Sequence, residues 1–170
     1  MDRGAMLFGA TLFIILAALT SIASSKNGEP DTNGAVASAI KHHLADFVGM
    51  DVIEGKDASF GPLVLCVESR VPLEMQAIER DLAGTVIEPV PANECRSETI
   101  EGDFGMFTAI EKYYDATGGE AAHLEVVSVS CSSTRTCIVD IDDFGSGERY
   151  TTRRKGQVWS VAERRMRWVV

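Results

Sequence analysis

The C-terminal third of the chain consists of four segments with strand character that are separated only by short turns. The segments cover residues 124–131, 136–144, 148–154 and 157–163. Strands joined by turns of this length pair as antiparallel neighbours. The pattern therefore predicts an antiparallel β-meander, and this is the strongest constraint on what the chain can fold into.

The residues before the meander predict two helices and further strands. Apolar residues recur at helical spacing up to Val48, and Gly49 can end that helix. Its apolar stripe consists of Val36, Ile40, Leu44 and Phe47. A second helix is predicted from Pro72 to Gly84, with its inward face formed by Leu73, Ala77, Ile78 and Leu82. Strands are expected at 63–68 and 85–90, a loop at 93–103, and a turn at 116–121. Residues 106–114 are predicted as a strand, with a helix as the alternative.

These elements predict an α+β fold. The N-terminal helix and the second short helix are expected to pack on one face of a curved antiparallel sheet of about five strands. The turns do not determine which face of the last hairpin is buried. Pairing about Lys155 and Gly156 puts Tyr150 beside Val161, whereas pairing about Ser146 puts the same row of side chains beside acidic residues. A β-bulge or a half-exposed groove would resolve this conflict.

The first 23 residues predict export. Residues 5–19 are apolar except for Thr11, and Ser21 and Ala23 have the small-x-small spacing of a signal peptidase site. We expect cleavage after Ala23, a flexible linker over 24–33 and a single domain over 34–170. The alternative is an uncleaved membrane anchor, because about 19 apolar residues nearly span a bilayer of roughly 30 Å. Both interpretations place the domain outside the cytoplasm, in the periplasm or secreted.

Four cysteines predict two disulfides in such a compartment. Cys131 and Cys137 flank a five-residue turn, and pairing them gives the hairpin one apolar face. The cross-strand pairs on that face are Val129 with Val139 and Val127 with Ile141. This leaves Cys66 to pair with Cys95. No two cysteines have the Cys-x2–4-Cys spacing of zinc knuckles, so we expect neither a metal nor another cofactor.

The sequence gives little support for a catalytic or metal site. The sequence contains no Gly-x-Ser-x-Gly, phosphate-loop or His-Glu-x-x-His motif. A calcium loop starting at Asp140 fails because Phe144 and Thr151 stand where oxygen ligands are required. His42 and His43 are adjacent, so they point to different helix faces, and they are interpreted as surface or partly packed residues.

The candidate binding residues lie on the last strands. Asp140 and Asp142 on one strand, with Tyr150 and Trp159 on the next two, are expected to form part of a binding surface. The formal net charge of −9 argues against nucleic acid as a partner and favours a basic one. The basic residues 153–155, 164, 165 and 167 are interpreted as solvated strand edges, with contact to anionic lipid headgroups or a polyanion as the alternative.

Segments of the sequence resemble a known group of proteins. Tyr150, Arg153, Gly156, Trp159 and Val161 resemble the last hairpin of small exported bacterial domains with a nuclear-transport-factor-2-like, or cystatin-like, cone. The segments Leu65-Cys66-Val67 and Glu94-Cys95-Arg96 are similar to a pattern in the same proteins. The resemblance covers residues 36–161 and implies an N-terminal helix against a bent sheet. Enzymes on this fold often place an Asp–His pair in the pocket, but the sequence identifies no such pair here.

The sequence thus predicts an exported, disulfide-bonded, non-catalytic domain that binds a protein or a small ligand. Two alternatives stay open. One is a small enzyme on a cone-shaped scaffold, with an internal pocket lined by Trp159, Tyr150 and an acid. The other is a membrane-tethered envelope protein that keeps the leader.

Overall fold

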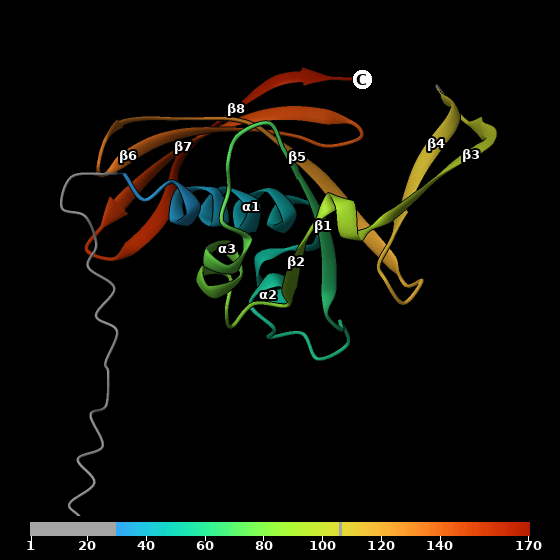
Figure 1. Ribbon diagram of the computed structural model, residues 1–170, viewed down its shortest axis with the longest axis horizontal. Helices are drawn as coiled ribbons and strands as arrows, with labels where there is room; N and C mark the ends of the chain where they lie inside the picture. Colours follow the sequence, from blue (N-terminus) through green and yellow to red (C-terminus); the bar gives the residue numbers. More distant parts are fainter. Residues whose placement is uncertain (1–29, 106) are drawn as a thin grey trace, which may run out of the picture.

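The computed structural model describes residues 30–105 and 107–170. The main features of this part are a sheet, a helix across one of its faces and a projecting hairpin (Figure 1). The predicted signal segment lies outside these residues. The helical elements are α1 (Thr32–Val48), α2 (Met50–Ile53), α3 (Met75–Asp81) and the 3-10 turn η1 (Ala92–Glu94). The strands are β1 (Leu63–Ser69), β2 (Ile87–Pro91), β3 (Arg96–Phe104), β4 (Phe107–Tyr114), β5 (Glu120–Ser133), β6 (Thr136–Asp142), β7 (Ser146–Lys155) and β8 (Val158–Val169).

The predicted α+β class and the C-terminal meander are confirmed, but the prediction of about five antiparallel strands is wrong. The sheet has eight strands, six of them in the order β2-β1-β5-β6-β7-β8. Strand β1 runs parallel to both β2 and β5, so the sheet is mixed. The parallel pair arises because α3 connects β1 to β2, and a crossover through a helix returns the chain in the same direction.

The additional strand β3 lies where the sequence predicts a loop. It pairs with β4 in a hairpin that extends away from the rest of the molecule (Figure 1), and we call this hairpin the arm. Its side chains are almost all exposed, so the segment lacks the apolar alternation that identifies a half-buried strand. The arm joins the sheet through only two residue pairs, Tyr113 with Ala121 and Tyr114 with Glu120.

Helix α1 crosses the sheet and covers one face of the meander (Figure 1). Val36, Ile40 and Leu44 of its predicted stripe are buried, whereas Phe47 is 66% exposed. The prediction for Phe47 is wrong because this last turn extends to the edge of the core. No helix in the described ranges is long and apolar enough to span a membrane.

The ends of α1 follow from local chemistry. The carboxylate of Asp31 accepts a hydrogen bond from the backbone N–H of Gly34 at 3.0 Å and caps the helix. The helix therefore begins at Thr32, two residues before the predicted domain boundary. Gly49 follows the helix with a φ of +92°, a conformation that favours glycine.

Both predicted disulfides are present. The Cα atoms of Cys66 and Cys95 are 6.2 Å apart, whereas those of Cys131 and Cys137 are only 3.9 Å apart. The second distance lies below the usual range of about 4.4–6.8 Å. The two residues are direct cross-strand partners next to the turn, and this geometry brings their backbones close together.

The strand register differs from the prediction in two places. Val129 pairs with Val139 as expected, but a bulge between Val126 and Ser128 places Val126 opposite Ile141, where Val127 was expected. The β6–β7 register resolves the conflict in the last hairpin, because it pairs Tyr150 with Val139 and Asp140 with Arg149. As a result Tyr150 lies on the buried face, and Asp140 lies on the opposite face with Arg149.

Candidate functional site

A groove lies between the arm and the β6–β7 turn. It has a volume of about 350 Å³ and is formed by three segments that are distant in sequence: β4, the start of β5 and the turn after β6. The residues that line it are Glu111, Lys112, Tyr113, Glu120, Ala121, His123, Glu125, Asp142, Asp143 and Phe144. The set contains five carboxylates and one lysine, so the groove is predominantly acidic.

Two stacked rings line the groove at the base of the arm. The ring centroids of Tyr113 and His123 are 4.0 Å apart, and the ring planes differ by only 7°. Burial, and next the hydrogen bond to Glu111, raise the pKa of Tyr113 to about 12, so its hydroxyl stays protonated at neutral pH. The imidazole Nε2 of His123 lies 3.5 Å from a carboxylate oxygen of Glu68. The stack therefore places a flat aromatic surface between acidic side chains.

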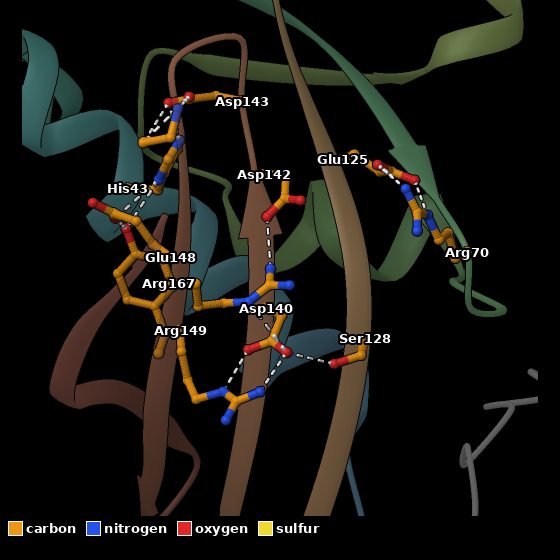
Figure 2. A network of polar contacts seen from close by, with 12 residues as sticks. His43, Arg70, Glu125, Ser128, Asp140, Asp142, Asp143, Glu148, Arg149 and Arg167 are labelled. Atoms are coloured by element: carbon orange, nitrogen blue, oxygen red, sulfur yellow. Dashed lines mark hydrogen bonds and ion pairs between the residues drawn. The ribbon is translucent and has the colours of Figure 1, made fainter. Parts of the chain in front are cut away.

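The acidic residues of the groove differ in their partners. Glu125 and Asp142 are cross-strand neighbours, and each is paired with an arginine (Figure 2). Arg70 donates to Glu125 at 2.8 Å, and Arg167 donates to Asp142 at 2.6 Å. These arginines offset the repulsion that two adjacent carboxylates would otherwise have.

Two further acids lie on the arm side of the groove. Lys112 donates to Glu120 at 2.7 Å, and this contact lowers the pKa of Glu120. Glu111 has no ion pair with any cation of the described residues. Glu111 is therefore the groove carboxylate whose charge is least compensated by the protein.

The tip of the arm contacts the β6–β7 turn. The ring centroids of Phe107 on β4 and Phe144 in the turn are 4.9 Å apart. This contact connects the two sides of the groove at a second place besides the Tyr113–His123 stack. The arm is thus fixed to the sheet at its base and to the turn near its tip.

A second cavity adjoins the groove on the other side of Phe144. It has a volume of about 520 Å³ and is lined by Phe47, His123, Asp143, Phe144, Gly145, Ser146 and Val169. The residues His123, Asp143 and Phe144 border both cavities. The two spaces therefore lie on either side of these shared residues.

A buried polar network holds the β6–β7 turn on α1. His43 is 1% exposed, and its Nε2 lies 3.2 Å from Asp143 Oδ2 (Figure 2). Its Nδ1 lies 2.9 Å from the hydroxyl of Tyr150 and 3.3 Å from Glu148 Oε2. The imidazole thus connects α1 to the turn and to strand β7, and His43 and Glu148 are 105 residues apart in sequence.

Glu148 is the buried anion of this network. Burial by itself would raise its pKa, but hydrogen bonds from Arg164 and Tyr150 outweigh burial and hold the pKa below its ordinary value. Arg164 also contacts Asp46 of α1 at 2.8 Å. The charge of Glu148 is therefore balanced by an arginine that bridges β8 and α1.

The Asp143 carboxylate borders the groove, but its oxygens are occupied. Oδ1 accepts hydrogen bonds from the backbone N–H groups of Gly145 at 2.8 Å and Ser146 at 2.5 Å. Oδ2 faces His43. This arrangement is typical of a residue that fixes a turn, because few lone pairs remain for a reacting group.

The binding residues predicted from sequence do not meet at one place. Asp142 lines the groove, whereas Asp140 is only 4% exposed and accepts two hydrogen bonds from Arg149 at 2.7 and 2.9 Å (Figure 2). Tyr150 is fully buried beneath α1. Trp159 donates to Asp31 at 3.1 Å and lines a separate cavity of about 280 Å³.

The sequence did not identify the residues that form most of the groove. Tyr113, Glu111 and His123 lie on strands whose pairing depends on where the arm joins the sheet, and no local spacing reveals that contact. His43 was expected at the surface or partly packed, and it is packed between acidic side chains. The only signal for His43 was its place beside the apolar stripe of α1.

Comparisons of the chain with protein-family models, with curated proteins and with solved structures found no match.

Proposed function

We propose that this chain is an exported, non-catalytic domain that binds a cationic ligand in the groove between the arm and the β6–β7 turn. One observation supports the proposal above all: five carboxylates and two stacked rings surround a cavity of about 350 Å³. Sites of this volume with a few convergent polar groups are typical of ligand binding. A cation gains from both features, since carboxylates attract its charge and an aromatic face attracts it through the ring quadrupole.

The chemistry favours a guanidinium or an ammonium group as the bound moiety. A planar guanidinium can stack on Tyr113 while it donates hydrogen bonds to Glu111. Glu125 and Asp142 already hold arginines, so the groove contains examples of the interaction that the ligand would make. An anionic ligand would instead be repelled by the walls.

Export is the second part of the proposal. Two disulfides are typical of proteins that fold in an oxidising compartment. We place the domain in the periplasm or outside the cell, with residues 1–23 either removed or retained as an anchor. The resemblance to nuclear-transport-factor-2-like domains stays a prediction.

A catalytic role is the weaker candidate. His43 and Asp143 form the kind of pair that the resemblance implies for an enzyme, but Asp143 is saturated with donors and His43 is buried. Tyr150 and Trp159, which the enzyme hypothesis places in one pocket, lie apart. Binding without catalysis therefore agrees better with the contacts.

Calorimetric titration with short peptides tests the proposal. A Gly/Ser peptide with one arginine should bind to the disulfide-bonded domain, and the same peptide with glutamate in place of arginine should not. Affinity should fall between about 20 and 200 mM salt, because screening weakens attraction between exposed charges.

Two variants make the test specific. Glu111→Gln should weaken binding of the arginine peptide at least threefold. Glu88→Gln makes the same chemical change on an exposed position of β2, outside the groove, and should leave the affinity unchanged. Equal effects of the two variants, or equal binding of both peptides, would contradict the proposal.

A further inference from the structure

Three exposed apolar side chains gather at the second cavity. Phe47, Phe144 and Val169 are 66%, 54% and 65% exposed, and all three line the space of about 520 Å³ next to the groove. They come from the end of α1, the β6–β7 turn and the end of β8. Large apolar residues that cluster on a surface mark interaction sites more often than isolated ones do.

The apolar cavity adjoins the acidic groove. His123, Asp143 and Phe144 border both spaces, so one ligand can occupy the two at once with Phe144 between its side chains. The acidic groove attracts charge, whereas the second cavity offers mainly phenyl and aliphatic contacts. The two halves thus complement two different kinds of side chain.

We infer that the ligand is a peptide segment of a partner protein that carries an arginine or lysine close to an aromatic or aliphatic residue, an inference that rests on the proposed function. The cationic side chain occupies the acidic groove, and the apolar side chain covers Phe47 and Val169. A small amine would fill only the first half and would leave the exposed apolar residues uncovered. The acidic groove complements a cationic side chain, and the second cavity complements an apolar one. A peptide can carry both side chains, so this combination favours a peptide.

The site is formed before the ligand arrives. The turn that carries Phe144 is anchored by Asp143 to the buried His43, and Phe144 also contacts Phe107 of the arm. Side chains that are already held in place lose little freedom on binding, and this improves affinity for a given set of contacts.

Calorimetry with three classes of peptide tests this inference on the intact, disulfide-bonded domain. The peptides share a Gly/Ser background and carry one arginine, one phenylalanine, or both, with one, two or three residues between them. At the best spacing, the peptide with both residues should bind at least tenfold more tightly than the arginine peptide. Equal affinities of these two would overturn the second site and leave the cation-binding proposal intact.

Variants locate the apolar contact. Phe47→Ser combined with Val169→Ser should reduce the affinity for the two-residue peptide to that of the arginine peptide, without weakening binding of the arginine peptide itself. Phe60→Ser is the matched control, because Phe60 is 52% exposed and lies outside both cavities. An unchanged affinity in the double variant would overturn the inference.

Two other outcomes separate the remaining possibilities. Binding of the phenylalanine peptide with the same sensitivity to Phe47→Ser, but no binding of the arginine peptide, would overturn the proposed cation site. If the domain sediments as a dimer and Phe47→Ser converts it to a monomer, the apolar patch is an interface between two copies of this chain. That result would overturn the inference.

Discussion

The rings of Tyr113 and His123 stack at 4.0 Å across the junction between the arm and the sheet. Strand β4 is attached to β5 by only two residue pairs, so this stack supplies a side-chain contact where the backbone ladder is short. The same two rings form part of the groove wall. The residues that attach the arm are therefore also residues that the ligand would touch.

Tyr113 should make the stability of the domain sensitive to alkaline pH. Because its pKa in the folded protein is raised to about 12, the unfolded chain loses this proton first, near pH 10. Stability that is present below pH 10 should be lost as the pH rises from about 10 to about 12. Urea unfolding of the wild type should show a steeper loss over this range than Tyr113→Phe, and parallel curves would contradict the assignment.

Glu148 should have the opposite dependence, at acidic pH. Its pKa is lowered in the fold from an ordinary value of 4.5, so its contribution is present above about pH 4.5 and is lost as the pH falls through the folded value. Glu148→Gln should lower the free energy of unfolding at pH 7 by about 3 kcal/mol, since it leaves a buried network without its anion. This deficit should shrink as the pH falls below about 4.5.

An exposed carboxylate on β8 provides the control for Glu148. Glu163 pairs with Arg165 at the surface, where its side chain is 48% exposed. Glu163→Gln should therefore change the free energy of unfolding by less than about 1 kcal/mol at any pH in this range. If both variants lose the same stability, the buried network does not have the role assigned to it.

The two disulfides should contribute unequally to stability. The Cys66–Cys95 bond closes a sequence separation of 29 and connects β1 to the residue before the arm, whereas Cys131–Cys137 closes a separation of 6. Chain entropy predicts losses of about 3–4 and about 2 kcal/mol when each pair is replaced by alanine. Urea unfolding of the two double variants gives the comparison, and a larger loss for the short loop would refute the entropic account.

The leader can be tested directly. If it is a cleaved signal segment, mass spectrometry of the exported protein should find a new N-terminus at Ser24. An intact N-terminus at Met1 in the membrane fraction would instead support the anchored alternative.

The sequence was sufficient for the features that depend on local patterns. The short turns specify the C-terminal meander, and the cysteine next to each side of a turn specifies one disulfide. The helical spacing of Val36, Ile40 and Leu44 specifies the buried face of α1. Each of these signals lies within a short stretch of consecutive residues.

The sequence was insufficient where structure depends on distant contacts. The arm strand β3 is exposed at all but one position and carries only two large apolar residues, so no apolar alternation indicates it. The β6–β7 register pairs Tyr150 with Val139 and Asp140 with Arg149, and it decides which side of the sheet each of these residues faces. The groove itself needs β4, β5 and the β6–β7 turn to meet, and only Asp142 of the predicted binding residues lies there.

The most direct test of ligand binding in the groove is a nuclear magnetic resonance titration of the ¹⁵N-labelled domain with the arginine peptide. Amide shifts should concentrate in residues 111–113, 120–125 and 142–144, with no comparable shifts around Asp140 or Trp159. A peptide that shifts no resonances, or shifts concentrated around Asp140 and Arg149, would contradict ligand binding in the groove.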